Sequence, residues 1–195
     1  MHDIYRKIYE EEEPELPGHF SSFKDGSKFQ ESVFFKSHPK ALQILLYLDE
    51  VQMCNPLGSK SSSRRKLVFV YFSLGNLSMR YRSGFHSIYL LSIFTAAQVE
   101  HFGINVLLRP IVEDLKILEL GVNIELNKII LPVYGTLVAI IADNLASNQL
   151  GGFKCGFSKS FRKCRTCLAS EEEIQSNFSH ASFITRTKEM HEDHG

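Results

Sequence analysis

The sequence predicts an α/β fold with a mixed β-sheet whose elements follow the order β-β-β-α-β. Two observations lead to this prediction: several apolar segments have the length and composition of strands, and one longer segment has helical spacing. Three strands joined by short connections favour an antiparallel meander. A helical crossover before the fourth strand allows that strand to lie parallel to an earlier one.

Four segments are expected to form the strands. Residues 41–49 and 66–73 are apolar runs of strand length, and the second is rich in β-branched and aromatic residues. Residues 87–94 are expected to form the third strand, although their composition also allows a helix. Residues 136–142 are nearly all apolar, as is typical of a strand that is covered on both faces.

The segment 97–120 carries apolar residues every three to four positions, which predicts a helix. Gly103 and Pro110 interrupt this pattern, so we expect either two helices or one kinked helix. Gly121 follows the last apolar position and is expected to end the helical segment.

The chain is expected to have three parts. Residues 1–38 form an acidic, poorly ordered lead-in, in which the run at 10–15 is read as a solvated tail rather than a partner-binding motif. Residues 39–150 form the α/β core, and residues 151–195 form a basic segment that contains Cys and His. We place the last boundary near Gly151 and Gly152.

The overall composition is that of an ordinary globular protein, with 44% hydrophobic and 23% charged residues among 195. It excludes a disordered, collagen-like or coiled-coil chain. The 22 Lys and Arg residues balance the 22 Asp and Glu residues, so any nucleic-acid partner must be argued from local patches. Four cysteines are too few for a disulfide scaffold.

The sequence lacks the signals of secretion, of membrane insertion and of the common nucleotide cofactors. The N-terminus has no apolar core of a signal peptide, and no apolar run reaches the length of about 20 residues that spans a bilayer. Neither GxxxxGK[ST] nor GxGxxG occurs. We therefore expect a nuclear or cytoplasmic protein with no membrane partner and no small-molecule cofactor.

Two aspartates, Asp49 and Asp143, each follow an apolar strand directly. If the first and fourth strands are parallel neighbours, both carboxylates emerge at the same edge of the sheet, where ligands of open α/β sheets bind. Two such carboxylates would hold a shared divalent cation or share a proton. Mg²⁺ or Mn²⁺ suits these oxygen ligands, and a pair of such ions supports phosphodiester chemistry. Asp is also common where a strand turns into a loop, so a purely structural role stays open for both residues.

Three blocks of the chain resemble a known group of proteins: YLDEVQMCNPLGSK (47–60), VYFSLGNLSMRYRS (70–83) and ADNLASNQLGGFKCGFSKSFRKCRTCLAS (142–170). They are similar to uncharacterised, transposon-derived animal proteins, which resemble DDE-type transposases of the Kyakuja–Dileera–Zisupton kind. The resemblance covers roughly residues 40–195. It implies a ribonuclease H-like core in which Asp49 and Asp143 are the first two catalytic acids.

The third catalytic acid that this resemblance implies has no convincing match among the residues of this sequence. Glu171, Glu172 and Glu173 are adjacent, but they are expected to begin or coat a helix. We therefore expect a partial core whose catalytic competence is open.

The C-terminal part contains a possible structural zinc site. Cys164 and Cys167 form a C-x-x-C motif, and His191 and His194 form an H-x-x-H motif. Zinc takes thiolates and imidazoles in pairs of this kind, and the resembled group carries a similar Cys pair followed by His. Accidental spacing and a redox pair are the alternatives. Two further residues, Cys155 and His180, are reserve ligands.

The segment 150–165 contains five cations and no acid: Lys154, Lys159, Arg162, Lys163 and Arg165. They are expected to contact nucleic-acid phosphates, although a solvated surface is the default reading of each. Together with the resemblance, they predict DNA as the partner and metal-dependent cleavage and strand transfer as the function. The alternative is a truncated or domesticated zinc-containing module that binds nucleic acid or protein without catalysis.

Overall fold

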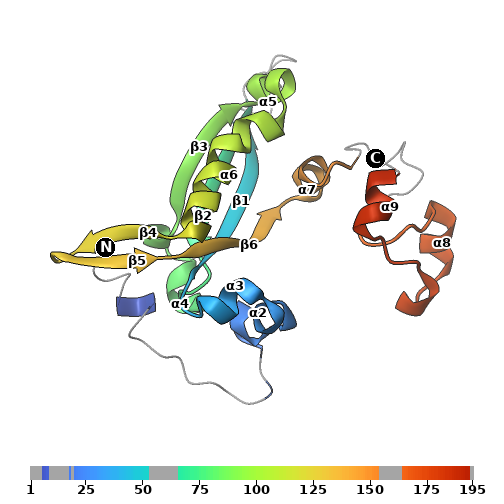
Figure 1. Cartoon of the computed structure of the whole chain (residues 1–195). Coiled ribbons are helices and arrows are strands. Elements are labelled where there is room, and N and C mark those ends of the chain that lie inside the picture. The colour runs from blue at the N-terminus through green and yellow to red at the C-terminus, as the bar shows by residue number, and fades with distance from the viewer. Residues whose placement is uncertain (1–5, 9–17, 19, 53–65, 154–163, 194–195) are drawn as a thin grey trace. The chain divides into compact units, whose positions relative to one another are not determined.

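The computed structural model describes residues 6–8, 18, 20–52, 66–153 and 164–193. The chain divides into two compact units, Met1–Ile141 and Ala142–Gly195. The first unit holds most of the β-structure, and the second consists of short helices and loops (Figure 1).

A four-stranded sheet with the order β3-β2-β1-β6 forms the centre of the first unit. Its strands are β1 (Leu42–Gln52), β2 (Lys66–Leu74), β3 (Tyr89–Thr95) and β6 (Gly135–Ala142). Strands β1 and β2 are antiparallel, and so are β2 and β3. The predicted meander is therefore confirmed, and its third member is a strand rather than a helix.

Strand β6 runs in the same direction as β1, which makes the sheet mixed. The two strands begin side by side, because the backbone N–H of Leu42 donates to the carbonyl of Tyr134 at 2.7 Å. A Cβ atom on Gly135 would lie 2.9 Å from the Cβ of Leu42 and 2.8 Å from a methyl carbon of Leu118. Glycine at this position therefore lets β1, β6 and the crossover helix approach one another closely.

The crossover between β3 and β6 contains two helices, α5 (Ala96–Phe102) and α6 (Ile104–Leu120). They are separated at Gly103, whose φ of 79° favours glycine. Helix α6 continues through Pro110 and ends at Gly121, whose φ is 97°. The predicted break thus falls at Gly103, and the predicted end at Gly121 is confirmed.

A β-hairpin that the sequence did not predict lies between α6 and β6. It consists of β4 (Val122–Leu126) and β5 (Ile129–Val133), which pair antiparallel. The two residues of its turn, Asn127 and Lys128, have φ values of 52° and 66°. Positive φ at both positions defines the tight turn that matches the twist of two paired strands.

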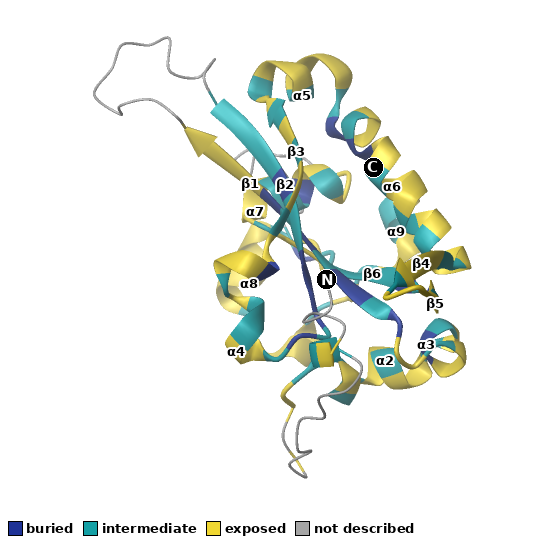
Figure 2. Cartoon of the chain, turned by 90° about the vertical axis from the view of Figure 1, so that its left-hand side faces the viewer, coloured by how far each residue is buried: buried dark blue, intermediate teal, exposed yellow. Residues whose placement is uncertain are grey.

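Helix α6 packs on one face of the sheet. On that face Ile44 and Leu74, which are partners in β1 and β2, form a buried cluster with Leu77. The α6 residues Leu115 and Leu118 pack against this cluster. Figure 2 shows the buried stretches in the middle of β1 and β2, whereas α5 and α6 keep exposed outer surfaces.

Three short helical segments precede the sheet: η1 (Phe23–Asp25), α2 (Ser27–Glu31) and α3 (Val33–Ser37). Residues 23–37 of the predicted lead-in thus form short helices whose aromatic rings pack together. The Phe29 and Phe35 rings lie 4.6 Å apart, and Phe35 is 4% exposed. The acidic run at 10–15 lies outside the described residues.

Two short helices, α4 (Met79–Arg82) and η3 (Phe85–Ser87), connect β2 to β3. The second unit contains α7 (Asn144–Leu150), α8 (Glu171–Ser176), η5 (His180–Ser182) and α9 (Lys188–Asp193). In the part of the chain that the structure describes, no helix combines the length and apolar character needed to cross a bilayer.

Candidate functional site

Asp49 is exposed near the end of β1, on the sheet face opposite α6. Strand alternation places Tyr47 on the same face, and the register places Tyr71 opposite Tyr47. Burial raises the pKa of the Tyr71 phenol above its ordinary value, and the nearby Asp49 carboxylate and Tyr47 raise it further. The Asp49 carboxylate is thus close enough to Tyr71 to affect the ionisation of its phenol.

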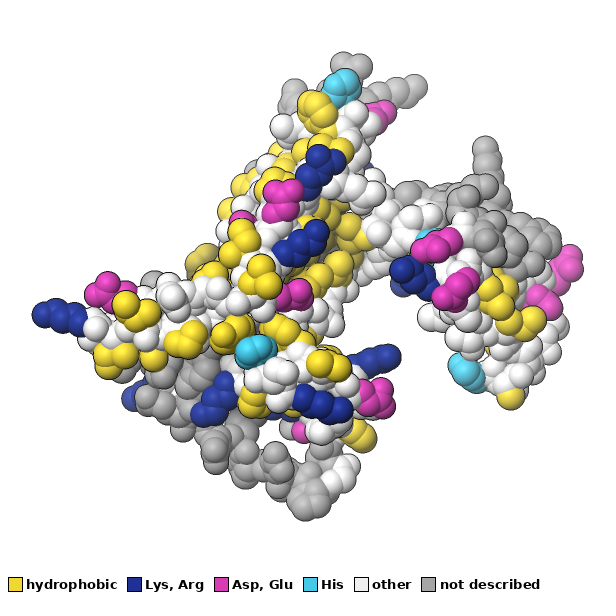
Figure 3. Space-filling model, in the orientation of Figure 1, with side chains coloured by type: hydrophobic (Ala, Val, Ile, Leu, Met, Phe, Trp, Pro, Cys, Tyr) yellow, Lys and Arg dark blue, Asp and Glu magenta, His cyan; other side chains and the backbone are white. Residues whose placement is uncertain are grey.

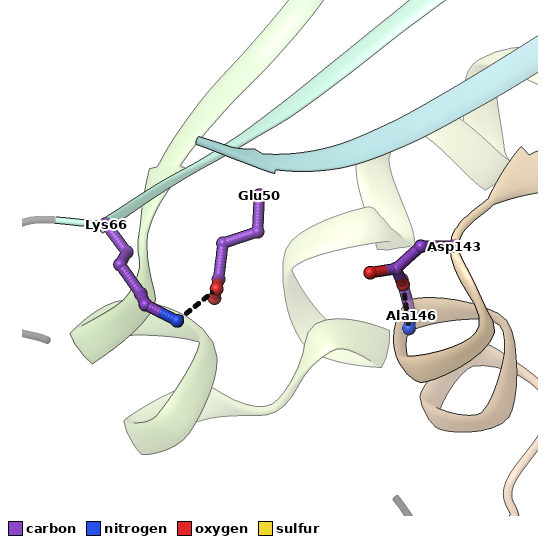
Figure 4. A network of polar contacts seen from close by, with 4 residues as sticks. All are labelled: Glu50, Lys66, Asp143 and Ala146. Atoms are coloured by element: carbon purple, nitrogen blue, oxygen red, sulfur yellow. Dashed lines mark hydrogen bonds and ion pairs between the residues drawn. The ribbon is translucent and has the colours of Figure 1, made fainter. Parts of the chain in front are cut away.

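Glu50, the next residue, points to the other face of the sheet, as strand alternation predicts. Its carboxylate forms an ion pair with Lys66 of β2, at 2.5 Å between Oε1 and Nζ (Figure 4). Glu50 is therefore paired with a residue of the neighbouring strand, and it lies on the face of the sheet opposite Asp49.

Asp143 directly follows the last residue of β6 and caps the N-terminus of α7. Its Oδ1 accepts a hydrogen bond from the backbone N–H of Ala146 at 2.7 Å (Figure 4). This bond satisfies one of the free N–H groups at the start of the helix. The cap holds the carboxylate in place and leaves its second oxygen, Oδ2, outside this bond.

Asp49 belongs to the first unit and Asp143 to the second. Each stands where the sequence places it: Asp49 on the first strand, and Asp143 immediately after the strand that neighbours the first. Both carboxylates have the hard oxygen ligands that Mg²⁺ and Mn²⁺ prefer. Their sharing of such an ion stays a prediction.

The acidic run Glu171, Glu172 and Glu173 begins helix α8, as predicted. The side chain of Glu173 accepts a hydrogen bond from the backbone N–H of Ser170 at 2.7 Å, and the Ser170 hydroxyl accepts one from the N–H of Glu173 at 3.2 Å. This reciprocal cap accounts for Glu173 by local structure alone. It supplies no evidence for a third catalytic acid.

Cys164 and Cys167 form a compact turn with free thiols. The Thr166 backbone N–H donates to the Cys164 sulfur at 3.4 Å, and the Thr166 hydroxyl lies 3.0 Å from it. Burial would raise the pKa of the Cys164 thiol, but hydrogen bonds from Thr166 and Cys167 outweigh it and lower this pKa to about 7. Burial raises the pKa of Cys167. One thiol is therefore readily ionised, as metal ligation requires.

A short stretch of chain around residue 185 holds this turn. Cys167 forms an antiparallel bridge with Thr185, and the Arg186 N–H donates to the Thr166 carbonyl at 2.9 Å. The Arg186 guanidinium donates to the Cys164 carbonyl at 3.3 Å and lies 5.3 Å from the centre of the Phe153 ring. The backbone of the C-x-x-C motif is thus fixed on both sides.

The predicted histidine ligands are not assembled around the Cys pair in the described residues. His191 lies in α9 with its ring 4.4 Å from that of Phe153, and His194 and Cys155 lie outside the described residues. His180 lies in η5. Across residues 6–8, 18, 20–52, 66–153 and 164–193, no group of three or more His, Cys, Asp or Glu could hold a metal. The Cys pair fits half of a zinc site, and the complete ligand set stays a prediction.

Arg165, between the two cysteines, contacts α7. Its guanidinium donates to the carbonyl and side-chain oxygens of Asn144, both at 3.2 Å, and to the side chain of Asn148 at 3.1 Å. The sequence suggested a phosphate contact for Arg165, and its part in holding α7 could not be read from spacing. The other four cations of this segment lie outside the described residues: Lys154, Lys159, Arg162 and Lys163.

A pocket that the sequence did not indicate lies in the first unit, on the same sheet face as Asp49. Its volume is about 260 Å³, and its lining combines two tyrosines, two serines, an arginine and an isoleucine. These residues are Tyr47, Tyr71, Ser73, Arg82, Ser83 and Ile88. The sequence does not indicate this pocket, because the two tyrosines come together only through the pairing of β1 with β2.

No protein-family model and no curated protein matches the chain.

Proposed function

We propose that this chain is part of a DDE-type transposase-like domain that performs metal-dependent phosphodiester cleavage and strand transfer on DNA. The observation that carries the proposal is the mixed sheet with the order β3-β2-β1-β6, in which β6 runs parallel to β1 after a helical crossover. This is the arrangement expected of a ribonuclease H-like core. Asp49 lies three residues before the end of β1, and Asp143 directly follows the neighbouring strand β6, so both belong to the part of the sheet in which the proposal expects acidic residues.

The proposed roles of these residues follow from their chemistry. Bound Mg²⁺ or Mn²⁺ ions would stabilise the attacking and leaving oxygens of the phosphodiester. The carboxylate of Asp49 is exposed, and that of Asp143 is oriented by its bond to Ala146. In the second unit, a zinc ion bound through Cys164 and Cys167 would have a structural role.

A second candidate is a truncated or domesticated, non-catalytic module that binds nucleic acid or protein. The helix-capping hydrogen bond of Asp143 favours it, because this bond explains an aspartate at this position without any bound metal. The reciprocal cap of Glu173 also leaves the third acid unassigned.

Nicking of supercoiled plasmid DNA in the presence of Mn²⁺ tests the catalytic proposal. Asp49→Asn and Asp143→Asn are expected to reduce nicking roughly a hundredfold or more, the scale on which removal of one group that stabilises the transition state acts. Asn remains a good helix cap, so Asp143→Asn keeps α7 intact.

Glu50→Gln is the matched control, because Glu50 neighbours Asp49 but lies on the opposite face and pairs with Lys66. It is expected to leave nicking unchanged. If nicking persists in both Asp variants, the assigned site is wrong. If the unaltered chain does not nick DNA but binds it, the non-catalytic module is the better description.

A further inference from the structure

The pocket on the Asp49 face is built around a pair of stacked tyrosines. Tyr47 and Tyr71 are direct partners in β1 and β2, and their rings lie 5.1 Å apart and nearly parallel, with an interplanar angle of 2°. Such a cross-strand pair stabilises a sheet by itself. Both residues are only half-buried, however, so part of their aromatic surface borders the pocket.

The lining of the pocket also includes a positively charged side chain. Arg82 and Ser83, at the end of α4, line it. The Ser73 hydroxyl donates to the Arg82 carbonyl at 3.3 Å, which ties the end of α4 to β2. The backbone that presents the Arg82 side chain is therefore fixed relative to the tyrosines.

Arg80, on the same helix, lies elsewhere. Its guanidinium carbon is 4.9 Å from the centre of the Tyr81 ring, and the ammonium nitrogen of Lys7 lies 4.4 Å from the same ring. Three cations thus gather around α4, but only Arg82 among them lines the pocket.

Helix α6 lies on the opposite face of the sheet from Asp49. There α6 presents Lys and Arg side chains interspersed with Asp, Glu and hydrophobic side chains, so neither sign dominates (Figure 3). A polyanion finds no continuous cationic surface along α6. On the Asp49 face, by contrast, Arg82 lines the same pocket as the two tyrosines.

We propose that this pocket binds one base of a single-stranded segment of DNA, with the Tyr47 and Tyr71 rings as the stacking surface and Arg82 as the contact to the adjacent phosphate. Bases stack on aromatic side chains whatever their sequence, and arginine binds phosphate oxygens. The volume of about 260 Å³ accommodates a single base rather than a duplex. Bases within a duplex are stacked on one another and are not available to the tyrosines.

The position of the pocket indicates which part of a DNA strand it would hold. Asp49 lies two residues beyond Tyr47 on the same face of β1, a step of roughly 7 Å along a strand. A strand seated on the tyrosines therefore lies within about one nucleotide of the Asp49 carboxylate. The inference rests on the proposed function only in taking DNA as the partner, and it does not require catalysis.

Binding of a single-stranded oligonucleotide of about 12 nucleotides, which contains one 2-aminopurine base, tests the proposal. The measurement is made with EDTA present, so that no metal-dependent step contributes. Stacking of the base on a tyrosine is expected to quench its fluorescence. Arg82→Gln is expected to weaken binding about tenfold, and Arg80→Gln, the matched control from the same helix, less than about threefold.

A second pair of variants tests the stacking surface. Tyr47→Leu is expected to weaken binding roughly 5- to 150-fold and to abolish the quench, the range found when one stacking aromatic is removed. Its control is Tyr89→Leu, because Tyr89 also stacks on a strand neighbour, Phe72 at 5.0 Å, but on the α6 face. Circular dichroism of each variant establishes that the sheet is retained.

The outcomes separate this inference from the proposed function. Equal binding by Arg82→Gln and Arg80→Gln, an unchanged quench in Tyr47→Leu, or no binding of single-stranded DNA at all overturns the pocket assignment. If plasmid nicking is absent but the matched variants differ as expected, the catalytic proposal fails and the pocket assignment stands.

Discussion

Different interactions stabilise each of the two units of this chain. In the described residues of Met1–Ile141, buried hydrophobic side chains come from helices, strands and loops that are far apart in sequence. They are Phe35, Ala41, Ile44, Leu46, Leu48, Val70, Leu74, Leu77, Ile104, Leu108 and Val133. In the described residues of Ala142–Gly195, Ala169 is the corresponding hydrophobic residue, and Asn148 is buried as a polar partner of Arg165.

This difference indicates what each unit needs in order to fold. The first unit can rely on burial of apolar surface, which contributes about 25 cal/mol per Å². The second unit is much shorter and relies on polar contacts, chiefly those of Arg165 and Arg186 with α7 and with the C-x-x-C turn. Units of this size rarely bury enough apolar surface to be stable alone and often add a metal. The predicted zinc ion would therefore matter most to the second unit.

The largest expected effect is that of zinc loss on the second unit. Cys164→Ser is expected to reduce the zinc content from about one ion per chain to near zero and to expose residues 164–193 to limited proteolysis, because ligand loss removes folding free energy. Zinc is measured by elemental analysis. Cys54→Ser serves as the control, because Cys54 is far from the Cys pair in sequence and is not among the predicted zinc ligands; it lies outside the described residues. If the zinc-free protein shows an unchanged proteolysis pattern, the second unit does not depend on zinc for its stability.

A core truncation is the next largest effect and acts on the first unit. Leu46 is 4% exposed, so Leu46→Ala is expected to lower the free energy of unfolding by about 2–5 kcal/mol through lost burial and the cavity that remains. Leu91→Ala, at a residue that is 42% exposed, is expected to change it by less than about 1 kcal/mol. Denaturant unfolding followed by circular dichroism distinguishes the two. Equal losses would mean that the sheet core is not what stabilises this unit.

The smallest effect concerns the polar contacts of the second unit. Arg165→Gln removes the hydrogen bonds to Asn144 and Asn148 and is expected to destabilise α7 by roughly 1 kcal/mol. Amide hydrogen exchange of α7 measures this change. Lys188→Gln removes an exposed ion pair with Glu192, at 3.8 Å, and is expected to cost less than about 0.5 kcal/mol. If α7 exchanges equally fast in both variants, Arg165 does not hold it.

Much of the first unit could be predicted from the sequence, because its strands and helices correspond to local runs and spacings of apolar residues. All ends of the four sheet strands lie within three residues of the expected segments. The break at Gly103 and the end at Gly121 follow from the one residue type that accepts their positive φ.

Other elements could not be predicted, for identifiable reasons. The hairpin turn uses Asn127 and Lys128 rather than the usual Asn-Gly pair, so its left-handed backbone gave no signal. Helix α7 is short and lacks the Glu or Gln that completes a capping box, since Ala146 occupies that position. The sequence therefore predicts Asp143 as a strand-end ligand and gives no indication that it also caps a helix.

In the candidate site, too, local sequence patterns do not predict contacts between residues that are far apart in the chain. The pattern of apolar residues predicts Asp143 directly after its strand, as the structure has it, whereas Asp49, predicted at a strand end, lies three residues before the end of β1. The meeting of Tyr47 with Tyr71 was not, because it depends on the register of two strands. The contacts of Arg165 with α7 likewise depend on chain folding that spacing does not encode.

The hairpin of β4 and β5 is bracketed by contacts that do not involve its strands. Gly121 precedes it and lies against the Tyr134 ring, where a Cβ atom would come within 2.5 Å. Tyr134 follows it, stacks on His38 at 3.8 Å and accepts the backbone hydrogen bond of Leu42. The two ends of the hairpin are thus anchored independently of its length. We expect the turn at Asn127 and Lys128 to accept an inserted epitope or fluorophore-binding peptide without disturbing the sheet, which makes it the natural attachment point for a reporter.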